Sequence, residues 1–410
     1  MTNKEKHIPQ GYKDSPLGII PMEWQVKRLG DLCHNQGDYG LNAPATDFSV
    51  DLPTYLRITD IDDNGKFNSI DKKSVNSPIS ENYYLSDGDI VFARTGATVG
   101  KTYLYNVKDG QLVYAGFLIK FSPNSHLLLP YFLKAHTETQ HYNNWVSVTS
   151  QRSGQPGINA TEYCSFRIAL PPIKEQERIC SVLQLWDTAI EKQSELIEKF
   201  KLRKRALMQQ LLTGKKRLPG FSGEWKEVKL GDIFDERNET NRDDLPLLSI
   251  TGDRGVIYQS DSDKRDISND DKSKYKRICP NDIGYNTMRM WQGRSALSNI
   301  EGIVSPAYTI VTPHKNVDVR FMAMLIQQPR IVYDFWTHSQ GLVSDTLNCK
   351  YPDFCQVKVR IPSKEEQTAI ADLLYEFDKE IDLANEKLAS LQSQKRGLMQ
   401  QLLTGKKRIK

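Results

Sequence analysis

Apolar residues recur at alternating steps of four and three in two long stretches of the chain, which is the spacing of a coiled-coil seam. In the first stretch eight of ten seam positions are apolar; the positions are Ile179, Leu183, Trp186, Ile190, Gln193, Ile197, Phe200, Lys204, Leu207 and Leu211. In the second stretch nine of ten are apolar; the positions are Ile370, Leu374, Phe377, Ile381, Ala384, Leu388, Leu391, Lys395, Leu398 and Leu402. The pattern predicts two amphipathic helices of about 39 residues, each roughly 58 Å long.

Both predicted helices carry start and stop signals. Two prolines precede the first helix, and Ser363 with Glu366 forms the pattern of a capping box at the start of the second. Gly214 and Gly405 lie where a left-handed C-terminal cap belongs, and Lys-Lys-Arg follows each of them near the negative end of the helix dipole. The two helices are therefore expected to begin and end at equivalent points.

The two helices also repeat each other in sequence. The block LMQQLLTGKKR occupies residues 207–217 and, letter for letter, residues 398–408, at an offset of 191. A shorter echo at an offset of 201 relates Glu23, Trp24, Leu29, Gly30 and Asp31 to Glu224, Trp225, Leu230, Gly231 and Asp232. The chain is therefore predicted to be a tandem duplication in the order domain, helix, domain, helix.

This organisation predicts an α+β protein, a tandem pseudo-symmetric repeat of two mixed α/β domains separated by two long helices that form an antiparallel coiled coil. The predicted segments are an N-terminal segment with the first domain at 1–170, a helix at 171–217, the second domain at 218–362 and a helix at 363–410. The second domain supplies enough chain for the second helix to run back along the first. The alternative is two independent amphipathic helices, each packed on its own domain.

Short β-rich runs bounded by Asp, Asn, Gly or Pro lie in both domains. The runs are 54–59, 89–93, 100–105, 117–121 and 166–170 in the first domain and 247–251, 283–286, 308–311 and 357–361 in the second. Each domain is therefore predicted to be a mixed α/β fold in which strands dominate.

The loops between these strands mix Arg, Gln, Ser, Asn and aromatic residues. Such mixtures can read DNA, because Gln and Asn suit adenine, Arg suits guanine, and Gly lets the backbone approach a phosphate. The candidate DNA contacts are Arg94, Lys101, Gln151, Arg152, Gln155, Arg289, Gln292, Arg294 and Gln340. The same composition is typical of ordinary solvated loops, so both interpretations stay open at this point.

Composition fits folded domains and permits a nucleic-acid partner without requiring one. Hydrophobic residues make up 39% of the chain, and 55 basic residues against 51 acidic ones give a net charge of +4. The richest apolar run, residues 127–133, is far too short to cross a membrane, and residues 1–7 lead into no apolar segment of a secretory signal. We therefore expect no membrane association and a location in the cytoplasm.

Motifs for catalysis and metal binding are missing from the sequence. The six cysteines include no CxxC pair, and the seven histidines are scattered. Three residues separate Gly96 from Gly100, whereas a phosphate-binding P-loop needs four, so a tight turn that presents Arg94 and Lys101 is expected instead. No HExxH, GxSxG or Asn/Asp-Pro-Pro-aromatic motif occurs. The chain is therefore expected to bind no metal and to be no enzyme on its own.

Several segments together resemble the DNA-specificity subunit of a type I restriction-modification system. They are GYKDSPLGIIPMEW at 11–24, GEWKEVKLGDI at 223–233, LPPIKEQERI at 170–179, IPSKEEQTAI at 361–370 and the two LMQQLLTGKKR blocks. FARTGATVGK at 92–101 and SGQPGIN at 153–159 resemble parts of the target-recognition domains of that family. The resemblance covers essentially the whole chain.

The resemblance implies a subunit without chemistry of its own. Each of its two target-recognition domains would read one half of a bipartite site in double-stranded DNA, and the coiled coil would set the spacer between the halves. Two methyltransferase subunits would dock around the helices to methylate adenines, and two restriction subunits would join them to cleave unmodified DNA. S-adenosylmethionine, ATP and Mg²⁺ are then expected on those partner subunits, with no cofactor on this chain.

The helix seam is the surface predicted for the coiled coil and for subunit docking. Its candidate residues are Trp186, Ile190, Phe200, Leu207, Phe377, Ile381, Leu391 and Leu398. The two domains differ in one motif, because RMWQGR at 289–294 replaces RTGATVGK at 94–101 and the familiar glycine turn is expected to be missing there. Unlike loops predict an asymmetric site. Two other classes stay open, namely a fused methyltransferase or nuclease and an adaptor that binds proteins or glycans.

Overall fold

The computed structural model describes residues 8–252, 254–262, 266, 268–341 and 346–409. Contacts within the chain divide it into two compact units. Unit 1 comprises residues 1–193 and 387–410, and unit 2 comprises residues 194–386. Each unit therefore contains one domain, the first part of one long helix and the last part of the other.

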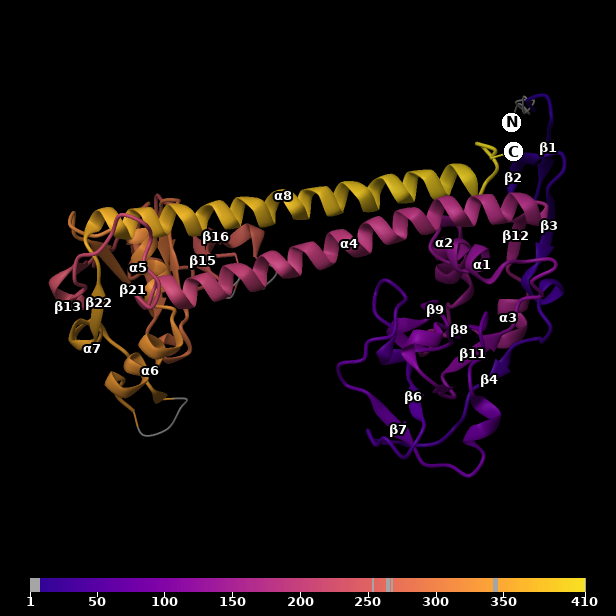
Figure 1. Ribbon diagram of the computed structural model, residues 1–410, viewed down its shortest axis with the longest axis horizontal. Helices are drawn as coiled ribbons and strands as arrows, with labels where there is room; N and C mark the ends of the chain where they lie inside the picture. The colour runs from indigo at the N-terminus through magenta and orange to yellow at the C-terminus, as the bar shows by residue number, and fades with distance from the viewer. Residues whose placement is uncertain (1–7, 253, 263–265, 267, 342–345, 410) are drawn as a thin grey trace. The chain divides into compact units, whose positions relative to one another are not determined.

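The two predicted helices are α4 (Ile173–Leu211) and α8 (Lys364–Leu402), each of 39 residues (Figure 1). All of the predicted seam positions are buried or half-buried, so the apolar stripe of each helix is covered. Gly214 and Gly405 follow the helices with φ angles of +69° and +71°. These angles confirm the left-handed caps that the sequence predicts.

The predicted capping box at the start of α8 is only half formed. Ser363 Oγ accepts a hydrogen bond from the Glu366 N–H at 3.5 Å. The Glu366 carboxylate instead accepts two hydrogen bonds from the Arg217 guanidinium, at 2.5 and 2.6 Å. Glu366 is only 1% exposed, and a buried carboxylate is stabilised best by a charged, two-pronged donor. The local prediction for Glu366 was wrong because this donor lies far away in the sequence.

The same ion pair recurs in unit 1 at the equivalent positions. Glu175 near the start of α4 accepts hydrogen bonds from Arg408, beyond the end of α8, at 2.5 and 2.8 Å. Farther along α4, Asp187 pairs with Lys395 of α8 at 2.7 Å. From the first pair to the second, the residue number rises along α4 and falls toward the start of α8. The two helix segments of unit 1 therefore run in opposite directions. The equivalent pairs of unit 2 give the same opposed direction there.

The first domain consists of short strands in small sheets, together with short helices. Its strands are β1 (Tyr12–Ser15), β2 (Gly18–Pro21), β3 (Gln25–Arg28), β4 (Asp38–Tyr39), β5 (Ala45–Asp47), β6 (Thr54–Leu56), β7 (Lys73–Val75), β8 (Ile90–Ala93), β9 (Thr102–Leu104), β10 (Leu112–Tyr114), β11 (Leu118–Phe121) and β12 (Arg167–Leu170), and its helices are α1 (Pro130–His136), α2 (Gln140–Thr149) and α3 (Ala160–Cys164). Four-stranded sheets have the orders β10-β6-β7-β5 and β4-β11-β8-β9, and β12 pairs with β3. Every β-rich run predicted for this domain contains a strand.

The second domain repeats part of this plan, with one four-stranded sheet among its described residues. Its strands are β13 (Lys226–Lys229), β14 (Phe234–Glu236), β15 (Leu248–Ile250), β16 (Val256–Tyr258), β17 (Lys276–Ile278), β18 (Ile283–Asn286), β19 (Ser295–Leu297), β20 (Gly302–Val304), β21 (Tyr308–Pro313) and β22 (Lys358–Ile361), and its helices are α5 (Val319–Leu325), α6 (Pro329–His338) and α7 (Tyr351–Gln356). The sheet β14-β21-β18-β19 has the same order as β4-β11-β8-β9, and β13 pairs with β22 as β3 pairs with β12. The duplication that the sequence predicts is therefore present in the topology.

A buried carboxylate precedes each of the equivalent strands β8 and β18. Asp89 accepts hydrogen bonds from the Ser86 N–H at 2.9 Å and from the Ser122 hydroxyl at 2.5 Å. Asp282 accepts equivalent bonds from a backbone N–H and from the Thr312 hydroxyl. Buried charges need such partners. The dipeptide Asp-Ile occurs at 89–90 and again at 282–283, and its carboxylate anchors the shared sheet in both domains.

Each unit has a core that joins its domain to both helices. In unit 1, Phe92 of β8 belongs to the same buried cluster as Ile179 of α4 and Leu402 of α8. In unit 2, one cluster contains Leu211 of α4 and Leu374 of α8 together with the domain. Both long helices keep a polar face, and no helix among the described residues has the length and apolar character needed to cross a bilayer.

His136 of α1 is fully buried, and its Nε2 has no hydrogen-bond partner within the described part of the chain. Burial, with a smaller contribution from His141, lowers the pKa of His136 to about 3. An unfolded histidine binds its proton near pH 6.5, so between these values the unfolded state binds a proton that the folded state does not. The free energy of unfolding is therefore expected to fall by about 1.4 kcal/mol per pH unit below pH 6.5.

Denaturant unfolding of the wild type and of His136→Leu at pH 8, 6 and 5 measures this effect. At pH 8 the imidazole is neutral in both states, so the difference between the two proteins there reports packing alone. At pH 5 the wild type is expected to have lost about 2 kcal/mol relative to the variant. Parallel pH profiles for the two proteins would contradict the prediction.

Candidate nucleic-acid interface

The loop after β8 and the loop after β18 occupy equivalent places in the two domains. They comprise residues 94–101 and 287–294, have equal length, and connect β8 to β9 and β18 to β19. Gly100 and Gly293 have φ angles of +87° and +74°, and each precedes a basic residue at the start of the next strand. The expectation that the glycine turn is missing from the second domain was therefore wrong for the end of the loop, whereas the place of Gly96, with φ +72°, is taken by Arg289 with φ −131°. The turn needs one left-handed residue before the strand, and Gly293 supplies it although the neighbouring letters differ.

A second loop joins the first one in each domain. The Ile158 N–H donates to the Arg94 carbonyl at 2.9 Å, and the Cys349 N–H donates to the Thr287 carbonyl at 2.9 Å. These two bonds are equivalent, so loops far apart in the sequence form one surface in both domains. In the first domain Gln155 reaches the turn, because a Cβ on Gly96 would lie 2.9 Å from its Nε2. The structure thus brings together the loop that carries Arg94 and the loop that carries Gln155.

The candidate cations of the first domain differ in how they are held. Arg94 lies over the Tyr39 ring with its Cζ 5.0 Å from the centroid, and no described residue accepts a hydrogen bond from its guanidinium. Lys101 pairs with Asp63 at 2.7 Å, and this hydrogen bond lowers the pKa of Asp63. Of the residues predicted as contacts in this domain, Arg94 is therefore the cation most available to a ligand.

Arg152 is held within its own loop. It binds the Glu162 carboxylate at 2.6 and 2.7 Å and donates to the Thr149 and Gln151 carbonyl groups, each at 2.8 Å. A guanidinium with this many partners orders the loop that carries it. The exposed side chain of Gln151 lies on the same loop. A direct DNA contact from either residue stays a prediction.

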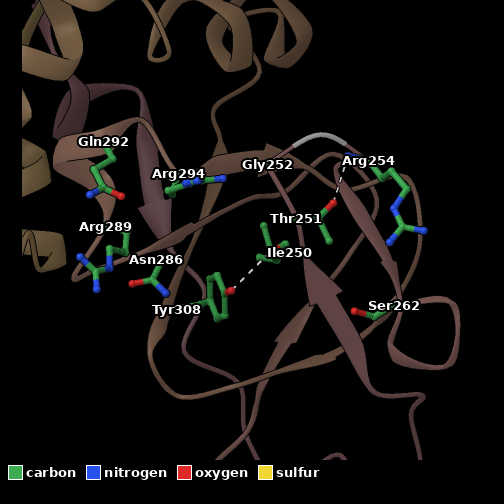
Figure 2. A pocket seen from close by; sticks show the side chains of 10 residues that line it. All are labelled: Ile250, Thr251, Gly252, Arg254, Ser262, Asn286, Arg289, Gln292, Arg294 and Tyr308. Carbon is green, nitrogen blue, oxygen red and sulfur yellow. Dashed lines mark hydrogen bonds between the residues drawn. The ribbon is translucent and has the colours of Figure 1, made fainter. Parts of the chain in front are cut away.

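Three of the candidate contacts in the second domain meet at one cavity of about 450 Å³ (Figure 2). Arg289, Gln292 and Arg294 all belong to the loop between β18 and β19. Gln340 does not line the cavity. Its side chain donates to Asp353 at 2.9 Å, and its backbone pairs with Asn348.

The other wall of this cavity comes from residues that the sequence reasoning missed. Thr251 and Arg254 belong to the turn between β15 and β16, and Asn286 and Tyr308 come from the central strands β18 and β21. The sequence TGDRG at 251–255 could have indicated this wall, because it has the same mixture of polar residues and glycine as the loops that carry the candidate DNA contacts. No carboxylate lines the cavity among the described residues, so its polar side chains are arginines, which only donate hydrogen bonds, and hydroxyl and amide groups, which both donate and accept.

The described residues hold no group of three or more His, Cys, Asp or Glu side chains that could bind a metal ion. The absence of a metal or cofactor on this chain stays a prediction. Burial raises the pKa of Tyr163, whose hydroxyl donates to the Ala93 carbonyl at 2.8 Å. This hydrogen bond ties Tyr163 to the residue that directly precedes the first loop.

The predicted seam residues lie on the covered side of the helices. Phe377 is buried, and the other seven candidates for docking are half-buried. The three most exposed large apolar side chains of α4 and α8 are Leu185, Leu202 and Leu383, with exposed fractions of 71%, 58% and 65%. These three leucines fall outside the seam positions, so they are not among the docking residues predicted from the heptad pattern.

Comparison with known proteins relates the whole chain to one family. A family model for the type I restriction modification DNA specificity domain matches residues 21–199 and 222–393. A relative from Methanocaldococcus jannaschii, named as a candidate MjaX specificity subunit of a type I restriction enzyme, is 24% identical and aligns over 98% of this chain and 97% of its own length. The type I restriction enzyme MjaVIII specificity subunit of that organism is 21% identical and aligns over 95% of this chain and 94% of its own length.

Solved structures share the fold. A chain from a study of complex assembly and conformational transition in a type I restriction-modification system has 17% identity and a TM-score of 0.58, with 94% of this chain and 99% of that one covered. The type I S subunit of M. genitalium has 13% identity and a TM-score of 0.53 over 93% and 96%. Because the two segments matched by the family model make up most of the sequence, the chain belongs to the type I restriction-modification DNA specificity family.

Proposed function

We propose that each domain of this chain reads one half of an asymmetric, bipartite site in double-stranded DNA. The observation that carries the proposal is the pair of joined loops, which occupies the same place on both sheets but bears different side chains. A common scaffold with unlike contacts reads unlike bases. Arg94 and Gln155 are the leading contacts of the first domain, and Arg289, Gln292 and Arg294 are those of the second.

The long helices set the spacer between the two half-sites. Each helix begins in one unit and ends in the other, and within each unit the two helix segments are antiparallel. The covered seam supports an antiparallel coiled coil that acts as a ruler. A rod of fixed length admits one separation of the half-sites, as for any reader built from two DNA-binding modules.

The chain itself is a recognition subunit without catalytic activity, and the chemistry belongs to its partners. Two methyltransferase subunits dock on the helices, where the exposed leucines Leu185, Leu202 and Leu383 offer apolar contacts. Two restriction subunits complete the complex. S-adenosylmethionine serves the methyltransferase subunits, and ATP and Mg²⁺ serve the restriction subunits. The complex works in the cytoplasm, where the DNA of the host lies.

Deletion of the gene is expected to remove one gapped N6-methyladenine motif from the source genome. The methyltransferase partners would remain, but the subunit that directs them to the site would be gone. Long-read maps of modified bases before and after deletion measure this, and a plasmid copy of the intact gene is expected to restore the motif. Persistence of every gapped motif in the deletion strain would contradict the proposal. A lost motif that is ungapped or palindromic would contradict the assignment of one unlike half-site to each domain.

A further inference from the structure

Arg294 carries a guanidinium that has no hydrogen-bond or ion-pair partner among the residues that the structure describes. It directly precedes β19, and its carbonyl accepts a hydrogen bond from the Asn286 N–H at 3.0 Å, which fixes its backbone to β18. Its side chain is exposed and lines the cavity of the second domain. No described residue forms a hydrogen bond or an ion pair with its guanidinium. The donors of Arg294 are therefore available to a ligand in the cavity.

Gly252 makes room for this side chain. A Cβ on Gly252 would lie 2.1 Å from Nη1 of Arg294, so any larger residue would displace the guanidinium. Figure 2 shows Arg294 extending from its own strand across the cavity toward Gly252 on the opposite wall. In this position the Arg294 guanidinium occupies space that a side chain at residue 252 would take.

The equivalent residue of the first domain is held differently. Lys101 takes the place of Arg294 before the next strand, and it pairs with Asp63 at 2.7 Å. Within the cavity, Arg254 donates to the Asp261 carbonyl at 3.0 Å. Arg294 is therefore distinguished both from its counterpart and from its neighbour by its available donors.

We propose that Arg294 reads a guanine in the half-site bound by the second domain, with Gly252 as the residue that positions it. The inference rests on the proposed function and deepens it. A guanidinium presents two parallel donors that match O6 and N7 of guanine in the major groove. The side-chain amides of Asn286 and Gln292 line the same cavity. Amides both donate and accept hydrogen bonds, as base edges do, whereas a phosphate only accepts.

The test replaces the chromosomal gene by variants and maps methylated motifs with long reads. Arg294→Ala removes the guanidinium with its two parallel donors. Arg294→Lys keeps the positive charge but not the two parallel donors, and Gly252→Ala displaces the guanidinium without changing the charge. Arg330→Ala is the matched control, because Arg330 is an exposed arginine of the same domain outside the cavity. The level of the full-length protein in each strain is measured by immunoblot.

Each of the three cavity variants is expected to relax the motif at one G·C pair of one half-site. Discrimination against the other bases at that position should fall by about 5- to 150-fold. The other half-site, the spacer and the Arg330→Ala motif should stay as in the wild type. If Arg294→Ala is poorly produced, Arg294→Lys and Gly252→Ala carry the test, since both keep a side chain in the cavity.

Two outcomes would overturn the proposal. Unchanged motifs in all three variants would show that Arg294 reads no base. A uniform loss of methylation in Arg294→Ala over all sites, at normal protein level and with methylation retained in Arg294→Lys, would make it a phosphate contact. Failure of the underlying function is distinguishable, because the deletion strain would then lose no gapped motif at all.

Discussion

Trp24→Ala is expected to lower the free energy of unfolding of unit 1 by about 3 to 5 kcal/mol. The Trp24 side chain is fully buried, and its indole N–H donates to the Glu175 carboxylate at 3.0 Å. The Arg408 guanidinium lies over the ring, 5.9 Å from the centroid. The substitution would therefore create a cavity where the N-terminal segment, α4 and the C-terminal tail meet, and it would deprive a buried carboxylate of a donor.

Hydrogen exchange of the full chain, followed by mass spectrometry, measures this because each unit is reported by its own peptides. Trp225→Ala is the matched control from the repeat. Trp225 is half-buried, and its indole nitrogen has no hydrogen-bond partner among the described residues. Its removal is expected to destabilise unit 2 by less than Trp24→Ala destabilises unit 1. Equal decreases in the free energy of unfolding for the two variants, or a decrease below about 1 kcal/mol for Trp24→Ala, would contradict this prediction.

Removal of one heptad from both long helices is expected to abolish methylation of the natural motif. Deleting 191–197 together with 382–388 keeps the four-and-three spacing of the seam and removes equivalent residues from both copies of the repeat. The rod would become about 10.5 Å shorter, which corresponds to about three base pairs of DNA at roughly 3.4 Å each. The two domains would then no longer reach both natural half-sites together.

Maps of modified bases in a strain with the shortened gene measure this effect. The expected result is a motif with the same half-sites and a shorter spacer, or no motif. The double substitution Glu195→Ala and Glu386→Ala is the control, because it changes exposed residues at equivalent positions without changing helix length. Continued methylation of the motif with its natural spacer by the shortened protein would contradict the hypothesis that helix length sets the spacer.

The helices and much of the sheets could be predicted because their signals are local and periodic. The seam positions, the left-handed glycines at 214 and 405, and the β-rich runs depend on residues a few positions apart. The tandem repeat was visible for the same reason, since equal letters at a fixed offset need no structure to be compared. These features fixed the fold class and the likeness of the two domains.

The side-chain partners at the candidate site could not be predicted, because they come from distant parts of the chain. Nothing in the sequence near Lys101 indicates its pair with Asp63, and the cavity of the second domain needs the turn at 251–255 to meet the loop at 287–294. The turn at the end of that loop was missed because the two loops differ in sequence. Its backbone depends on Gly293, which has the left-handed conformation.

The contact between Arg408 and Glu175 also bears on the order in which the protein folds during synthesis. Unit 2 is one continuous segment, residues 194–386, whereas unit 1 needs residues 387–410 to complete its core. Domains generally fold as they leave the ribosome, starting from the N-terminus. Here the domain that is translated first cannot complete its core, and part of its apolar surface stays uncovered, until residues 387–410 have been synthesised. A nonsense mutation at the codon for residue 387 would therefore damage unit 1, which is synthesised first, and spare unit 2, which is synthesised after most of it.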